Sequence, residues 1–132
     1  MELTNIREIF RNKDKFADKE VTIGGWVRSN RIQVVYGNGL DNYDEVGKIN
    51  VGAAIIVRGT LVLTPDAKQP FEIQAAEVTV EGASTPDYPL QKKRHTFEYL
   101  RTISHLRPRT NTFEAVFRVR SLCAYAIHKF FQ

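Results

Sequence analysis

The sequence has 132 residues, a hydrophobic fraction of 42%, a formal net charge of +4 and a pI near 9.3. This length accommodates one domain with an appendage, and the hydrophobic fraction is ordinary for a globular protein. No apolar run approaches the roughly 18 residues of a membrane span, and the first ten residues lack the apolar core of a signal peptide. We therefore expect a cytoplasmic protein with no membrane partner.

The positive charge is concentrated towards the C-terminus. Residues 1–90 contain 10 Lys or Arg and 13 Asp or Glu, whereas residues 91–132 contain 9 and 2. A basic pI fits a nucleic-acid partner, but phosphate contacts supply most of the affinity of sequence-blind binding. The first 90 residues are therefore poorly equipped to bind nucleic acid by charge alone.

The first predicted element is a short N-terminal helix. Thr4 is a plausible N-cap, and Ile6, Ile9 and Phe10 fall on one helical face, which needs another surface to pack against. From Glu20 onwards the apolar residues alternate with polar ones, which indicates a strand.

Four stretches have the composition of strands, namely residues 20–28, 32–36, 54–63 and 71–80. Turn signals separate them, and there is almost no helix between them. The Gly24-Gly25 pair indicates a sharp bend in the first strand. This pattern is typical of a small antiparallel barrel or sandwich.

The composition changes after Glu81. Two prolines and no periodicity predict an extended linker over residues 82–89. Residues 96–105 predict a short helix. Asn111 and Glu114 have the spacing of a capping box at the start of a long helix with a wide apolar stripe, which requires a partner surface.

No residue pattern argues for catalysis or for a metal. The histidines His95, His105 and His128 are scattered, without a second ligand at metal-binding spacing. No phosphate-binding glycine motif or nucleophile motif occurs. Cys123 lies in an apolar stretch, which predicts a buried thiol.

Recognition of nucleic acid remains as one interpretation. Arg28, Arg31 and Gln33 follow or occupy predicted strands, with Trp26 nearby, and both Arg and Gln can hydrogen-bond to the edge of a base. Exposed Arg and Gln are also common on ordinary strands. Spacing alone therefore leaves both interpretations open.

Several segments resemble one family. Residues 25–31 (GWVRSNR) and 32–36 (IQVVY) are similar to the first and third strands of the OB-fold anticodon-binding domain of class IIb aminoacyl-tRNA synthetases. Residues 67–72 (AKQPFE), 87–95 (DYPLQKKRH) and 106–113 (LRPRTNTF) are similar to the bacterial asparaginyl branch. The resemblance covers almost the whole chain.

This resemblance implies a mainly β fold, an OB-fold-like antiparallel barrel with an N-terminal helix and a C-terminal helical extension. It implies an anticodon-binding domain over residues 1–81, a hinge over residues 82–110, and the start of a class II catalytic domain over residues 111–132. Its partner would be asparagine tRNA, with no DNA. The parent enzymes attach asparagine to this tRNA, using ATP and Mg²⁺.

The resemblance also assigns roles to individual residues. Gln33 is expected to read the central uracil of the asparagine anticodon, assisted by Arg28 or Arg31. A neighbouring base would be approached from a loop and the strand that follows it, by Lys68, Gln69 and Glu72. A dimer interface is expected along the last helix, at Phe113, Val116, Phe117, Arg120 and Ile127.

The sequence departs from the family pattern after Arg31. There the family has a second strand carrying an aromatic residue that stacks on a base, whereas Arg31 here is followed directly by Ile32. We therefore expect an incomplete barrel, in which the two flanking runs pair antiparallel, merge into one bent strand, or leave an open edge. Loss of a stacking aromatic removes about 1–3 kcal/mol of base binding.

The sequence shows only the helix of class II motif 1, not motifs 2 and 3, which hold ATP in the family. We therefore expect no catalytic residues, no bound cofactor and no aminoacylation by these residues alone. The alternative function is a self-associating remnant that ignores RNA and uses the apolar stripe and an open sheet edge. A third interpretation is that the residues belong to a complete ligase.

Overall fold

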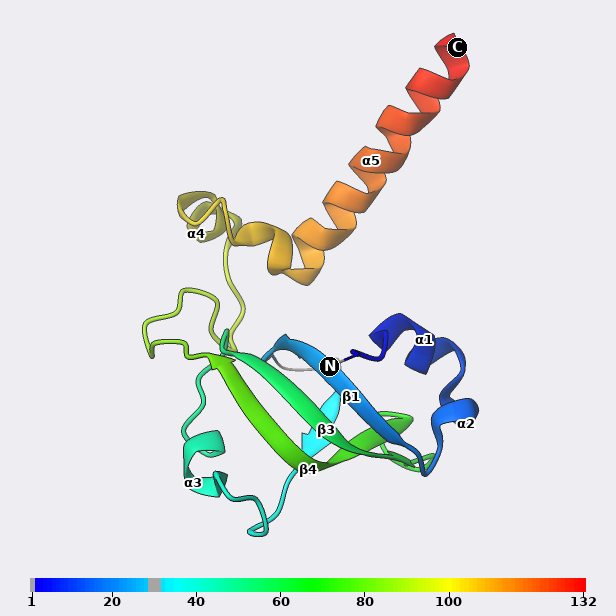
Figure 1. Ribbon diagram of the computed structural model, residues 1–132. Coiled ribbons are helices and arrows are strands. Elements are labelled where there is room, and N and C mark those ends of the chain that lie inside the picture. The colour runs from blue at the N-terminus through cyan, green and yellow to red at the C-terminus, as the bar shows by residue number, and fades with distance from the viewer. Residues whose placement is uncertain (1, 29–31) are drawn as a thin grey trace. The chain divides into compact units, whose positions relative to one another are not determined.

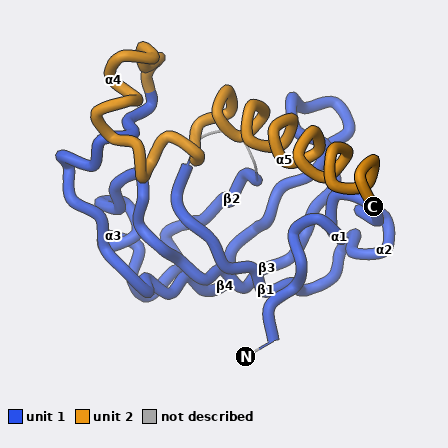
Figure 2. The backbone as a smooth tube through the Cα atoms, turned by 90° about the horizontal axis from the view of Figure 1, so that it is seen from above, with its two compact units in different colours: residues 1–92 blue, residues 93–132 orange. Residues whose placement is uncertain are grey.

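The computed structural model describes residues 2–28 and 32–132 (Figure 1). Two compact units divide the chain, residues 1–92 and residues 93–132 (Figure 2). Among the described residues, no helix combines the length and the apolar character needed to cross a membrane.

The first unit is built on a four-stranded sheet. Its strands are β1 (Glu20–Trp26), β2 (Gln33–Val35), β3 (Ala54–Leu63) and β4 (Phe71–Gly82). They lie in the order β1-β3-β4-β2. The β1–β3 and β3–β4 pairs are antiparallel, and β2 pairs in parallel with β4.

Although β1 and β2 are consecutive in the chain, they lie at opposite edges of this sheet. Both strands run parallel to β4. Strand β1 is antiparallel to β3, which is antiparallel to β4, and β2 pairs in parallel with β4. In the part of the chain that the structure describes, no strand joins the two edges. The expectation of an incomplete OB-fold-like barrel is confirmed, and the open edge is the form it takes.

The core lies on the face of the sheet that the alternating apolar residues share. Val21 and Ile23 of β1 are buried, as the period-two pattern predicts. The remaining core side chains come chiefly from β3, β4 and the first helix, including Val57, Leu61, Phe71, Ile73, Val78 and Ile9.

Helix α1 (Ile6–Arg11) packs on this core, since Ile9 is fully buried and the Phe10 ring lies 4.9 Å from the Phe71 ring. The prediction of a packed N-terminal helix is confirmed, but its cap is Asn5 rather than Thr4. The Asn5 side chain accepts a hydrogen bond from the Arg7 amide at 2.9 Å. Two further short helices belong to this unit, α2 (Lys13–Phe16) and α3 (Tyr43–Val46).

Strand β3 carries the glycine that the sheet requires. A Cβ at Gly59 would lie 2.2 Å from the Gln74 carbonyl oxygen, next to a register shift between Arg58 and Gly59. A Cβ at Gly25 would meet no atom within 4 Å. The steric requirement for glycine therefore falls on Gly59, which the sequence pattern did not single out, and not on Gly25.

The chain that follows β4 stays attached to the first unit as far as Lys92. The Ser84 hydroxyl donates to the Val51 carbonyl at 2.9 Å, and the Asn50 amide donates to the Ser84 carbonyl at 3.1 Å. The Tyr88 ring covers Gly52, which has a φ of +95°. This segment is irregular, as its prolines indicate, yet it is held by specific contacts.

The second unit contains α4 (Phe97–Thr102), a 3-10 turn η1 (Arg107–Arg109) and α5 (Asn111–Phe131). The long helix is therefore confirmed. Its N-cap is Thr110, whose hydroxyl accepts from the Phe113 amide at 3.4 Å, so the prediction of a cap at Asn111 was one residue too late. Cys123 is exposed, which corrects the expectation of a buried thiol.

Candidate nucleic-acid interface

Gln33 and Glu72 form the centre of the candidate site. They are direct partners in the parallel β2–β4 register, and both alternate with residues that face the core. The Gln33 Nε2 donates to Glu72 Oε2 at 3.3 Å. Gln33 is exposed and Glu72 is half-buried, so a ligand can reach the glutamine amide.

Gln69 joins this pair from the loop between β3 and β4. Its side-chain oxygen accepts a hydrogen bond from the Gln33 main-chain N–H at 2.9 Å. The loop is closed by the Thr64 N–H, which donates to the Pro70 carbonyl at 3.1 Å, and by the Thr64 hydroxyl, which donates to the Gln69 carbonyl at 2.8 Å. The β3–β4 loop therefore fixes the start of β2.

The structure thus brings Gln33, Gln69 and Glu72 together, although 39 positions separate Gln33 from Glu72 in the chain. Lys68 is exposed and adjacent to Gln69, and Arg28 is exposed two residues beyond the end of β1. Arg31 lies outside the described residues. Whether any of these side chains binds RNA stays a prediction.

Exposed aromatic rings also lie on this unit, and only Trp26 among them had been named from the sequence beside the expected contacts. The Trp26 side chain is 65% exposed at the end of β1, and Tyr36 and Tyr43 are exposed with ring centroids 5.6 Å apart. Such rings can stack on unpaired bases. The alternation along β1 places Trp26 on the face opposite Val21. Whether another strand covers that face cannot be read from the alternation.

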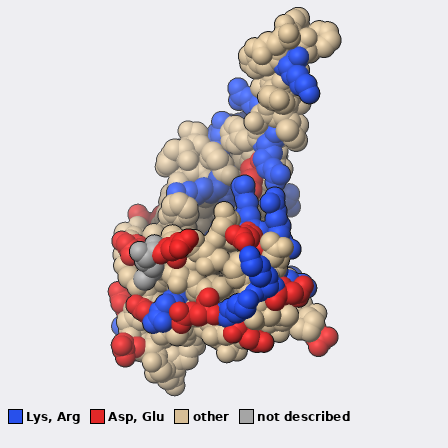
Figure 3. Space-filling model, turned by 45° about the vertical axis from the view of Figure 1, so that its right-hand side comes forward, with Lys and Arg blue, Asp and Glu red and all other residues tan. Residues whose placement is uncertain are grey.

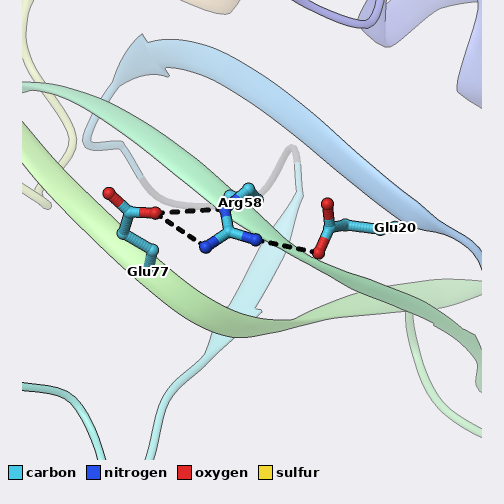
Figure 4. A network of polar contacts seen from close by, with 3 residues as sticks. All are labelled: Glu20, Arg58 and Glu77. Carbon is cyan, nitrogen blue, oxygen red and sulfur yellow. Dashed lines mark hydrogen bonds and ion pairs between the residues drawn. The ribbon is translucent and has the colours of Figure 1, made fainter.

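The electrostatics of the first unit are balanced rather than basic. Figure 3 shows acidic and basic side chains interspersed over this unit on the face in view, and chiefly basic ones over the second unit. Arg58 of β3 illustrates the balance, because its guanidinium contacts Glu77 at 2.9 Å and Glu20 at 3.0 Å (Figure 4). Hydrogen bonding to Glu77 and the two carboxylate charges raise the pKa of Arg58 above its ordinary value.

The group formed by Gln33, Gln69 and Glu72 is therefore suited to recognising bases by hydrogen bonds rather than to attracting phosphate by positive charge. An amide offers both a donor and an acceptor, whereas a carboxylate repels phosphate and accepts from base amino or imino groups. Among the described residues, no three His, Cys, Asp or Glu side chains converge to hold a metal ion.

Solved structures with the same fold are aminoacyl-tRNA synthetases. The chain superposes on asparaginyl-tRNA synthetase from Pyrococcus horikoshii complexed with asparaginyl-adenylate, with a TM-score of 0.80 and 19% identity, over 98% of this chain and 34% of that one. For aspartyl-tRNA synthetase from Entamoeba histolytica the TM-score is 0.72 and the identity 17%, over 98% and 37%. The chain therefore shares the fold of the aligned region of these synthetases.

Curated sequences identify the branch. Asparagine-tRNA ligases from Clostridium tetani and Acetivibrio thermocellus are 50% and 54% identical to the chain, over all of it and 32% of each relative. The chain is a homologue of asparagine-tRNA ligases and corresponds to their N-terminal region. It spans about a third of the length of these relatives. No protein-family model matches it.

The alignments also show that residues are missing relative to these homologues. The aligned region with the Clostridium tetani protein is 150 residues long and this chain has 132, so at least 18 aligned positions have no counterpart here. The expected shortening relative to the family is thus supported by the length of the alignment.

The residues expected at a dimer interface have two different environments. Phe113 and Phe117 are half-buried within the second unit, because the Arg107 guanidinium lies over both rings at 5.0 and 5.9 Å. Val116, Arg120 and Ile127 are exposed on α5. The first pair therefore stabilises the base of the helix, and the other three are accessible to a partner.

Proposed function

We propose that this chain binds the anticodon of asparagine tRNA, with Gln33 contacting the central base. The observation that carries the proposal is the exposed Gln33 side chain, held with the half-buried Gln69 and Glu72 by hydrogen bonds of 2.9 and 3.3 Å. The group lies on a domain homologous to part of asparagine-tRNA ligases. Lys68, Arg28 and Arg31 would contribute contacts from its surroundings.

The charge distribution supports recognition of bases in this unit. Residues 1–90 carry 10 basic and 13 acidic side chains, so phosphate attraction cannot dominate their affinity. Unstacked bases of a single-stranded loop can instead be read on their edges by amide and guanidinium groups. The anticodon loop of a tRNA presents such bases.

A titration with anticodon stem-loops tests the proposal. The labelled asparagine stem-loop and a non-cognate stem-loop are each titrated with the protein at two salt concentrations. We expect tighter binding of the asparagine loop at both salts, since base contacts survive screening better than phosphate contacts. Equal binding of the two loops at both salts would reject anticodon recognition.

The contribution of Gln33 is tested by substitution. Gln33→Ala is expected to weaken binding of the asparagine loop by about 1–3 kcal/mol, as for loss of a base contact. Gln74→Ala is the matched control, because Gln74 is also an exposed glutamine, lies on the neighbouring strand β4 and has no assigned role. An unchanged affinity for Gln33→Ala, or an equal loss for both variants, would remove Gln33 from the site.

For the enzyme to which this region corresponds, we propose the activity of its homologues, ATP-dependent attachment of asparagine to tRNA in the cytoplasm. The homologues are named as asparagine-tRNA ligases, and one related structure is complexed with asparaginyl-adenylate. The described residues would contribute to this activity by binding tRNA. ATP and Mg²⁺ would act in a part of the enzyme beyond this N-terminal region.

A second candidate function is self-association through α5, and a specific observation favours it. The helix has no buried residue, and many of its apolar side chains are more than half exposed, including Val119, Leu122, Tyr125, Ile127, Phe130 and Phe131. Sedimentation velocity over a range of protein concentrations tests this. Ile127→Glu is expected to shift the protein to monomer, whereas a monomer at every concentration in the unsubstituted protein would reject the interface.

A further inference from the structure

We infer that Glu72 is a positioning residue, which fixes the orientation of the Gln33 amide and so makes the site distinguish uracil from cytosine. This inference rests on the proposed contact between Gln33 and the central anticodon base. It adds a reason for specificity, because an unrestrained glutamine can present either order of donor and acceptor.

The hydrogen bond between the two side chains determines which way the amide faces. An ionised carboxylate only accepts hydrogen bonds, so the Gln33 group 3.3 Å from Glu72 Oε2 must be the NH₂ group. Turning the amide by 180° would place its oxygen against the carboxylate, two acceptors facing one another. The Gln33 oxygen therefore lies on the side away from Glu72.

The backbone on both sides of this bond is held as well. The Gln33 N–H donates to Gln69 Oε1 at 2.9 Å, and Gln33 pairs with Glu72 in the β2–β4 register. The Gln69 carbonyl is itself bonded by the Thr64 hydroxyl at 2.8 Å. The amide thus presents one acceptor and one remaining N–H in a fixed order.

This order separates the two pyrimidines. Uracil presents the O4 acceptor beside the N3–H donor, whereas cytosine presents the N4–H₂ donor beside the N3 acceptor. When the base is held in one orientation, an amide of fixed orientation is complementary to only one of the two pyrimidines. Binding of the other pyrimidine would require the amide to turn. With uracil as the proposed base, cytosine is disfavoured by the bond to Glu72.

Binding of two stem-loops tests the inference. The probes are the asparagine anticodon stem-loop with U at the central position and the same loop with C there. We expect the unsubstituted protein to prefer U by about tenfold, the scale of a lost bidentate contact. Glu72→Gln is expected to reduce the preference to about twofold or less, because an amide at position 72 can donate or accept and no longer fixes Gln33.

The ratio of affinities is the informative quantity, since loss of a negative charge raises the affinity for any RNA. Glu77→Gln is the matched control, because Glu77 lies on the same strand and contacts Arg58 instead. This variant has the same charge change and is expected to keep the full preference for U. Circular dichroism of both variants verifies that the sheet is intact.

The outcomes separate this inference from the proposed function. If the unsubstituted protein binds the U and C loops equally, both fail. If it prefers U and Glu72→Gln keeps the full preference, the positioning role is wrong and anticodon binding stands. Loss of affinity for both loops by one factor would mean that Glu72 itself contacts the RNA, which also overturns the positioning role.

Discussion

The Thr4 backbone N–H donates to the Thr22 carbonyl oxygen at 2.7 Å, on the edge of β1 that does not face β3. Leu3 lies over the next position on that edge, since a Cβ at Gly24 would be 3.1 Å from Leu3 Cδ1. An open strand edge is a template for pairing with another chain. The N-terminal segment therefore covers part of the outer edge of β1.

Thr4→Pro is expected to weaken this cover, because proline has no N–H to donate to Thr22. The free energy of unfolding should fall by about 1 kcal/mol, as for the loss of one hydrogen bond, and self-association should increase. Urea unfolding and sedimentation measure the two effects. Thr4→Ala, which keeps the N–H, is the control, and equal behaviour of the two variants would contradict this role of the segment.

Gly59→Ala is expected to be strongly destabilising. The new Cβ would lie 2.2 Å from the Gln74 carbonyl oxygen and 2.8 Å from the Ala75 Cα, both of them backbone atoms. Overpacking of this kind costs about 1–3 kcal/mol or more. Gly25→Ala, with no atom within 4 Å, should change the free energy of unfolding by less than about 1 kcal/mol. Similar losses for the two variants in urea unfolding would contradict the packing at Gly59.

The Asp87 carboxylate provides a pH-dependent readout of the segment after β4. Hydrogen bonds from the Thr85 side chain and from the Asp87 backbone hold its pKa below the ordinary value. A depressed pKa stabilises the folded state above the unfolded pKa, and this stabilisation is lost as the pH falls through the folded pKa. The relevant window is thus acidic, below about pH 4.

Thr85→Val is expected to raise the Asp87 pKa towards its ordinary value, whereas Thr85→Ser should keep it low because the hydroxyl remains. Carboxyl-carbon NMR titration of the folded protein measures both. The hydroxyl would play no part if the two variants titrated alike.

Thr110→Ala is expected to destabilise the start of α5, because the Thr110 hydroxyl accepts from the Phe113 amide and donates to the Arg107 carbonyl at 2.7 Å. Removing an N-cap costs about 1 kcal/mol. Thr110→Ser retains both bonds and serves as the control. Amide hydrogen exchange over the first turn of α5 should accelerate in the alanine variant alone, and unchanged exchange would show that the cap lies elsewhere.

Much of the fold could be predicted from local patterns. Alternation in β1 placed Val21 and Ile23 in the core, and the helical period placed Ile9 on the packed face of α1. Cap positions were one residue out at Asn5 and Thr110, because neighbouring polar side chains compete for the same free amides. The burial of Cys123 was wrong, since an apolar helix is buried only where another surface covers it.

The candidate site was predicted less completely. Gln33, Gln69 and Glu72 were identified by resemblance, but their mutual hydrogen bonds depend on β2 pairing in parallel with β4. Parallel pairing joins residues far apart in the chain and leaves no local signature. The requirement for Gly59 was missed for the same reason, because the atom that excludes a side chain there belongs to another strand.

By itself, the sequence determined the approximate positions of the strands and of α1, α4 and α5, the resemblance to the family, and the shortening relative to it. These follow from periodicity and from motifs read along one chain, whereas the short helix α2 was not predicted. The tertiary structure alone decided that β1 and β2 lie at opposite edges and that Glu72 bonds to Gln33. Such contacts are set by register across the sheet, where a shift of one residue would turn every side chain to the other face.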